Sequence, residues 1–230
     1  MMRTQGNVAL RALLVLLALV SFGAAAAQAQ TDVTVDPALI NLGYMNVFDL
    51  GGNYQWGSGW GIGDLTAVYS GSILTLGPNT IGDPNEYWYQ CVGGVTPPNC
   101  GGPGAPGNKI MEANLYAQVD GALAGQTVTF SGELLSNTMT GAHTVKAFIK
   151  DFAPDFSSFV QSVVVLSAPG PFSLSLAAIN DPARHVQWGF QTTGVNVWVT
   201  DLAPFGTMVV GPDGTVSSET MSWGTIKALY

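Results

Sequence analysis

The chain has 230 residues, of which only 10% are charged, and its formal net charge is −8 at pH 7. This acidic balance argues against nucleic acid or an anionic membrane surface as a partner, because both need clustered Lys and Arg. The low charge, together with 29 glycines, favours an all-β protein, because β-sheet surfaces can be built from Thr, Ser, Asn and Gln.

The first thirty residues have the layout of a secretory signal. Arg3 and Arg11 flank the start, an apolar run covers 12–20, and small residues fill 24–27. Charge, then a short apolar core, then an Ala-x-Ala-like exit is typical of a cleaved signal peptide. The run is shorter than the roughly 20 residues of a membrane span, although an uncleaved N-terminal anchor is the alternative. We therefore predict a signal peptide over 1–30, no membrane span after its cleavage, and a protein that is secreted, extracellular or at the cell surface.

The residues after the signal are expected to form one β domain over 31–212, followed by a C-terminal tail over 213–230. Alternation is clearest over 111–119, where Glu112, Asn114, Tyr116 and Gln118 share one face and apolar residues share the other. In chain order we expect a lead-in or edge strand over 31–37, an apolar run over 38–50, a Gly and Trp loop over 53–64, and strands over 66–70, 73–76, 111–119, 127–135, 144–152, 159–166, 172–178, 185–192 and 195–202. About ten strands without a convincing helix predict a two-sheet antiparallel β-sandwich.

A Gly- and Pro-rich insertion over 78–108 carries the two cysteines, Cys91 and Cys100. In an oxidising compartment they are expected to form a disulfide, since the alternative of a metal or redox pair lacks further ligands and a Cys-x-x-Cys spacing. Closing so short a loop should contribute roughly 2.5–3 kcal/mol to stability.

Three groups of motifs follow one another in an order that resembles a known family. They are an Asn46-Val-Phe-Asp49 opening with Gly and Trp after it, an alternating strand followed by a Thr-Val-Thr-Phe-Ser strand over 113–131, and two closing strands over 186–201. Together they resemble the jelly-roll carbohydrate-binding modules of secreted bacterial glycoside hydrolases, in the galactose-binding-like group. The likeness covers about 41–202, and the opening departs from the family in a shorter Asn-to-Phe spacing and in Asp for Glu. It implies a jelly roll that binds a polysaccharide or cell-surface glycan.

The resemblance also implies a structural calcium ion, with Asp49 and Asp201 at the matching positions. Calcium takes six to eight oxygen ligands, and carbonyls of a Gly-rich turn can supply several of them. The alternative is that both are ordinary surface or turn carboxylates.

The polar faces of the expected strands carry residues suited to sugars, which present C–H faces flanked by hydroxyl groups. If the strands are neighbours, their amides form a stripe with Tyr116 and Trp198 as aromatic platforms; the alternative is a solvated outer face. Trp88, in the insertion, is the candidate for a loop contact, whereas Trp188 points inward by alternation. The ligand-binding candidates are Asn114, Tyr116, Gln118, Gln187, Gln191, Trp198 and Trp88.

No catalytic motif stands out. The carboxylates show no recognisable pair for glycoside hydrolysis, and candidate bases for a lyase are few. The Gly-x-Ser-x-Gly elbow is missing, two histidines make a zinc site improbable, and His143 follows a turn, where we expect it to be solvated. The sequence thus favours a non-catalytic carbohydrate-binding protein. The alternative is a structural matrix, surface-layer or filament subunit that self-associates through β-strand contacts.

Overall fold

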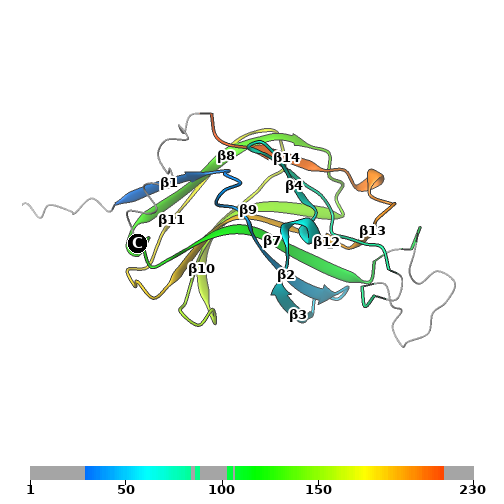
Figure 1. Ribbon diagram of the computed structural model, residues 1–230, viewed down its shortest axis with the longest axis horizontal. Helices are drawn as coiled ribbons and strands as arrows, with labels where there is room; N and C mark the ends of the chain where they lie inside the picture. The colour runs from blue at the N-terminus through cyan, green and yellow to red at the C-terminus, as the bar shows by residue number, and fades with distance from the viewer. Residues whose placement is uncertain (1–28, 84–85, 89–102, 106, 215–230) are drawn as a thin grey trace, which may run out of the picture.

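The computed structural model describes residues 29–83, 86–88, 103–105 and 107–214. Two six-stranded sheets face each other and a two-stranded sheet lies beside them (Figure 1). Within these residues there is no α-helix, and the helical turns are two short 3-10 segments, η1 (Ile62–Leu65) and η2 (Ala203–Phe205). The all-β sandwich predicted from the sequence is confirmed.

The first sheet is organised around one long strand, β8 (Thr127–Asn137). One edge of β8 pairs with β11, and the other pairs first with β1, in parallel, and then with β14. Beyond β14 follow β5 and β4. The bounds of these strands are β1 Gln30–Thr34, β4 Ala67–Ser70, β5 Ile73–Leu76, β11 Gly170–Ala177 and β14 Met208–Gly211.

The second sheet is antiparallel throughout, in the order β10-β9-β12-β7-β2-β3. Its registers place Gln187 of β12 beside Gln118 of β7 on one side and beside Lys150 of β9 on the other. Gln191 lies beside Asn114 in the same way. The strands are β2 Leu42–Asp49, β3 Tyr54–Gly59, β7 Lys109–Asp120, β9 His143–Phe152, β10 Phe159–Val165 and β12 His185–Val195.

The core lies between the two sheets and is formed by the inward residues of the alternating strands. Trp188 is fully buried, as its alternation predicts, and so are Phe130 and Phe190, whose ring centroids lie 5.5 Å apart. Burying one such side chain contributes about 1.5–3 kcal/mol, so these rings account for a large part of the attraction between the sheets. The opposite face of the second sheet is left free for polar residues.

The third sheet corrects one prediction. The strand expected over 195–202 is reduced to β13 (Val197–Trp198), which pairs in parallel with β6 (Thr80–Ile81). Trp198 is 8% exposed and belongs to the hydrophobic core, so its expected place on the polar sheet face is wrong. The chain leaves β12 after Val195 and joins a different sheet, and the alternation of β12 therefore does not extend to Trp198.

Two further segments differ from expectation. The Gly and Trp segment, expected as a loop over 53–64, contains β3 and η1, and β14 was not predicted at all. Residues 1–28 of the expected signal, most of the tail and both cysteines, Cys91 and Cys100, lie outside the described residues, whereas Gln30, the last residue of the expected signal, begins β1. Among the residues described, no helix is long and apolar enough to cross a membrane.

Candidate functional site

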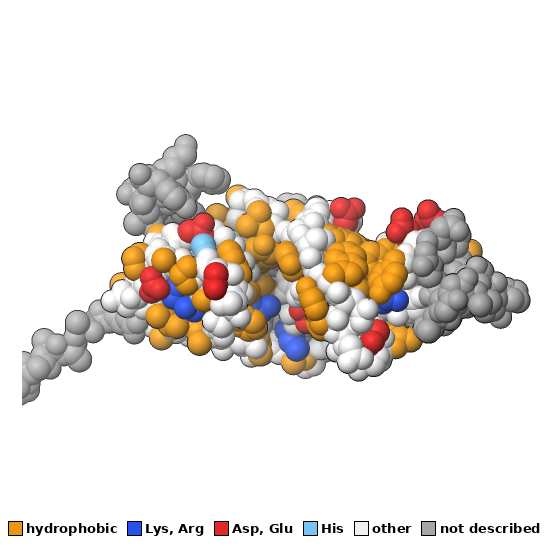
Figure 2. Space-filling model, turned by 90° about the horizontal axis from the view of Figure 1, so that it is seen from below, with side chains coloured by type: hydrophobic (Ala, Val, Ile, Leu, Met, Phe, Trp, Pro, Cys, Tyr) orange, Lys and Arg blue, Asp and Glu red, His pale blue; other side chains and the backbone are white. Residues whose placement is uncertain are grey.

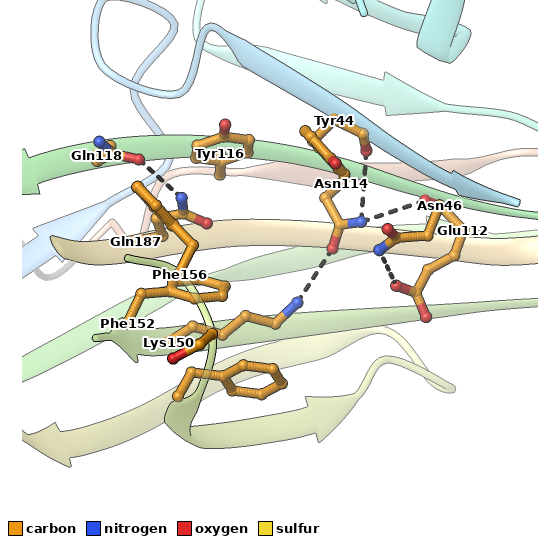
Figure 3. A pocket seen from close by; sticks show the side chains of 12 residues that line it. Tyr44, Asn46, Glu112, Asn114, Tyr116, Gln118, Lys150, Phe152, Phe156 and Gln187 are labelled. Atoms are coloured by element: carbon orange, nitrogen blue, oxygen red, sulfur yellow. Dashed lines mark hydrogen bonds between the residues drawn. The ribbon is translucent and has the colours of Figure 1, made fainter. Parts of the chain in front are cut away.

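A groove of about 600 Å³ lies on the outer face of the second sheet, lined by residues of β2, β7, β9, β10 and β12 and of the β9–β10 turn. In the space-filling view, seen from below relative to Figure 1, hydrophobic side chains alternate with uncharged surface (Figure 2). Acidic and basic side chains are scattered over this face and do not gather into a patch of one charge. The close-up shows side chains from several strands converging on the groove (Figure 3).

Gly189, in the middle of β12, lies close to the backbone of β7. Gly189 pairs with Tyr116 on one side and with Phe148 on the other. A Cβ atom here would collide with the carbonyl oxygen of Leu115 on β7, so the position requires glycine. The Lys150 side chain reaches across β12, from β9 to Asn114 on β7 (Figure 3).

Four of the predicted amides form two hydrogen-bonded pairs, and three of them, Asn114, Gln118 and Gln187, line the groove. Gln187 Nε2 donates to Gln118 Oε1 at 2.8 Å, and Gln191 Nε2 donates to Asn114 Oδ1 at 3.0 Å. Asn114 Nδ2 in turn donates to the backbone carbonyl oxygens of Glu112 (3.2 Å) and Tyr44 (3.4 Å). Asn114, Gln187 and Gln191 are each less than 9% exposed. These contacts hold the predicted stripe in fixed orientations.

Aromatic rings complete the groove, and only one of them was predicted. Tyr116 is half-buried between the two amide pairs, and burial raises the pKa of its phenol. Tyr44 on β2 and Phe159 on β10 are 37% and 46% exposed and line opposite sides. The alternation of β2 could have placed Tyr44 and Asn46 on this face, but the apolar run over 38–50 was assigned no faces.

Lys150 and Glu112 are the charged residues that line the groove within the described part of the chain. Lys150 Nζ donates to Asn114 Oδ1 at 3.2 Å and lies 4.4 Å from the ring centroid of Phe148. Burial lowers the pKa of Lys150, and the Glu112 carboxylate partly opposes this change. Glu112 Oε1 accepts a hydrogen bond from Asn46 Nδ2 at 2.9 Å. Sequence reasoning missed Lys150 because nothing in its spacing separates a buried lysine from a solvated one.

One end of the groove is fixed by His185 and Phe156. The two rings are stacked, with centroids 4.3 Å apart and an interplanar angle of 5°. His185 Nδ1 lies 2.7 Å from Asp120 Oδ1, and this hydrogen bond raises the pKa of the imidazole. Phe156 adopts a left-handed φ of 58° in the β9–β10 turn, a strained conformation for a bulky residue.

The structure contradicts the expected role of Trp88. Its side chain is 9% exposed and packs against Trp56 and Trp60, with centroids 5.1 and 5.8 Å away. Packing in this cluster withdraws the Trp88 ring from solvent. Its neighbour Tyr87 is 40% exposed, and the Lys109 ammonium lies 4.0 Å above its ring. Trp88 and Trp198 therefore both lie outside the groove.

The two proposed calcium ligands have separate partners. Both Asp49 carboxylate oxygens accept hydrogen bonds from Asn53, whereas Asp201 Oδ2 accepts one from the Gly104 backbone N–H at 2.6 Å. Among the described residues, no three His, Cys, Asp or Glu side chains cluster closely enough to hold a metal ion. Three of the four carboxylate oxygens accept from N–H groups and Asp201 Oδ1 accepts from the Thr200 hydroxyl, so the two side chains as arranged here do not form a calcium site. The calcium ion stays a prediction, to be decided by thermal unfolding in calcium and in EDTA.

His143 is also placed differently from expectation. It is the first residue of β9, is 6% exposed, and its Nε2 lies 2.9 Å from the carbonyl oxygen of Val195. Burial lowers the pKa of its imidazole. The predicted solvated turn residue is therefore a buried one, because the strand begins earlier than the sequence pattern indicated.

Comparison with known proteins does not assign this chain to a family. No protein-family model matches the chain, and no curated protein matches it. One solved structure is similar, with 13% identity and a TM-score of 0.32, over 75% of this chain and 84% of the other. That structure comes from work on the promiscuous specificity of carbohydrate-binding modules from the β-sandwich superfamily. A likeness this distant carries no argument about what the present groove binds.

Proposed function

We propose that the protein is a secreted, non-catalytic carbohydrate-binding β-sandwich that binds a polysaccharide or cell-surface glycan in the outer groove. The observation that carries this proposal is that tyrosine rings and hydrogen-bonded amides share one concave face. The C–H face of a sugar ring packs on an aromatic ring, and its hydroxyls exchange hydrogen bonds with amides. The volume of about 600 Å³ is within the usual range for ligand sites.

Rigidity supports binding at this site. The groove is built on paired strands, and Asn114 and Gln187 are already oriented by their neighbours. A ligand that meets fixed groups loses less free energy in ordering them. In the described chain one carboxylate, that of Glu112, lines the groove, whereas glycoside hydrolysis by the common mechanisms uses two facing carboxylates. The arrangement is suited to holding a glycan.

The test is affinity electrophoresis of the purified protein against a panel of soluble polysaccharides, with Tyr116→Ala as the variant. We expect retention by at least one glycan and an affinity about tenfold weaker in the variant, from loss of the aromatic platform. The matched control is Tyr54→Ala, an exposed tyrosine on the same sheet that does not line the groove. Equal loss in both variants, or no retention by any glycan, would contradict the proposal.

Secretion belongs to the same proposal and rests on the signal layout of 1–30 and on the cysteine pair. The mass of the intact protein recovered from the medium should lack about thirty N-terminal residues, as a signal of this length predicts. It should also be two hydrogens short of the reduced chain, because Cys91 and Cys100 are expected to be joined. A full-length or reduced mass would contradict this part.

A second function, a structural subunit that self-associates, is favoured by strand β10. It is an edge strand that pairs with β9 and with no other strand among the described residues. Its sequence, FVQSVVV, has no charge and no proline, and Val160, Val163 and Val165 are more than 40% exposed. An apolar edge strand without charged residues or proline is a template for strand addition between copies of the chain.

Sedimentation of the concentrated protein tests this second function. If β10 mediates assembly, Val163→Lys should shift the distribution toward monomer, because a charge at an edge opposes strand pairing. Val68→Lys, at a 63% exposed position of β4, is the control and should leave the distribution unchanged. A wild-type protein that stays monomeric at high concentration would eliminate the structural function.

A further inference from the structure

The Lys150 ammonium is a buried cation with an incomplete set of partners. Its side chain is 8% exposed and its Nζ donates one hydrogen bond within the described chain, to Asn114 Oδ1. An ammonium has three N–H donors, so two of them have no protein acceptor in this part of the chain. No carboxylate oxygen of the described residues lies within 4.0 Å of Nζ.

The surroundings compensate the charge only in part. The ring faces of Phe148 and Phe159 lie 4.4 and 5.6 Å from Nζ, and each can stabilise a cation through its quadrupole. The Asn114 oxygen contributes a neutral dipole. A buried ammonium without a paired anion is costly, so an anion brought to this place would gain both from direct attraction and from low solvent screening.

We propose that the sugar unit bound over Lys150 carries a carboxylate that pairs with its ammonium, so that the groove selects a polysaccharide containing uronic acid. This inference rests on the proposed function and names its substrate class. The Lys150 ammonium lies beside Asn114 in the groove, whose lining also includes the rings of Tyr116 and Phe159. A uronate combines an apolar ring face with one charged group, matching the rings and the single lysine.

Glu112 restricts how the ligand can lie. Its carboxylate is held by Asn46 Nδ2 on the β2 side of the groove, and the next negative charge of the ligand would be repelled there. The uronate carboxylate therefore belongs away from Glu112, above the Lys150 ammonium. The net charge of −8 gives the acidic polymer no long-range attraction, so recognition has to arise at this short-range contact.

The experiment uses matched ligand pairs. Polygalacturonate, alginate and glucuronan are each compared with a counterpart whose carboxyl groups have been reduced to primary alcohols. We expect wild-type protein to bind at least one acidic polymer about tenfold or more tightly than its reduced form, as a buried ion pair would give. In Lys150→Met the ratio of the two affinities should fall to about one.

Lys146→Met is the control, because Lys146 lies on the same strand and the same face but outside the groove. An equal loss in both lysine variants would show nonspecific charge attraction and overturn the inference. Equal binding to acidic and reduced polymers, still lost in Tyr116→Ala, would overturn the inference and leave glycan binding intact. No binding to any polymer of a wider neutral and acidic panel would overturn the proposed function itself.

Discussion

Asp151 is fully buried and ties β9 to the turn that precedes β12. Its Oδ1 accepts a hydrogen bond from Arg184 Nε, and its Oδ2 accepts one from the Ile179 backbone N–H, both at 2.8 Å. Arg184 Nη2 also donates to the Asp151 carbonyl oxygen at 2.7 Å. A carboxylate taken fully out of water is tolerated here because each of its oxygens has a donor.

Replacing this carboxylate should be costly. In Asp151→Asn the guanidinium stays in place without its counter-charge, and an amide N–H₂ faces an existing donor. We expect the free energy of unfolding to fall by about 3–5 kcal/mol, measured by urea denaturation. Asp64→Asn, an exposed carboxylate in η1, should leave the midpoint unchanged. A change of similar size in both variants would contradict this account of Asp151.

The two histidines of the chain have opposite environments. The hydrogen bond with Asp120 raises the pKa of His185, whereas burial lowers the pKa of His143. For His185 the stabilising contribution is fully present below the unfolded pKa near 6.5 and is lost as pH rises through the higher folded pKa. For His143 the unfolded chain takes up a proton that the folded chain does not, so stability falls as pH decreases below 6.5.

Imidazole NMR should therefore show two titrations, one with a midpoint above 6.5 and one below it. His185→Gln should remove the upper titration and also the loss of stability on the alkaline side. It should leave the lower titration in place. Two midpoints on the same side of 6.5 would show that one of these environments is wrongly assigned.

Strand β12 approaches the backbone of β7 closely at Gly189. Gly189→Ala would push a methyl group against the Leu115 carbonyl oxygen and would displace β12 from β7. We expect a loss of about 1–3 kcal/mol in the free energy of unfolding, together with weaker glycan binding. Gly59→Ala in β3 is the matched control, since its nearest atom would be 3.9 Å away. Denaturation and affinity electrophoresis of both variants test this, and a neutral Gly189→Ala would contradict it.

Alternation predicted the long strands because it continues over many residues there. Thus β7, β8, β9 and β12 were all expected within a few residues of their observed ends. Strand β3 contains two glycines in six residues and shows no alternation, and β14 is only four residues long. Such segments become strands because the edge of a neighbouring strand is free to pair with them. The local sequence pattern carries no information about that neighbour.

Strand alternation also explains which residues of the groove could be predicted from the sequence. Asn114, Tyr116 and Gln118 follow one alternating strand, and Gln187 and Gln191 follow its neighbour, so their shared face could be expected. Lys150, Tyr44, Phe156 and Phe159 enter through the register of three further strands and one turn. Trp198 was misplaced because the chain changes sheets, an event with no signal beyond the end of β12.

Strand β14 joins two parts of the first sheet, because it pairs with β8 on one side and with β5 on the other. Val210 is fully buried and pairs with Leu74 of β5 on one side and Leu134 of β8 on the other. Val210→Asp should prevent folding, because it places an unpaired charge in the core. Val68→Asp, on the exposed face of β4, should fold normally. Circular dichroism and tryptophan fluorescence compare the two, and a folded Val210→Asp protein would contradict this expectation.

The contact between the first and last described strands has a consequence for the time course of folding. The Asp213 N–H donates to Thr34 Oγ1 at 3.0 Å, across 179 residues of sequence, and β1 itself pairs with a strand nearly a hundred residues later. Contacts this distant close slowly, on the millisecond-to-second scale of β-sandwiches. A chain that emerges N-terminus first cannot complete its first sheet until nearly all of it is available. We therefore expect the first sheet to be completed late, once β14 is available to pair with β8 and β5.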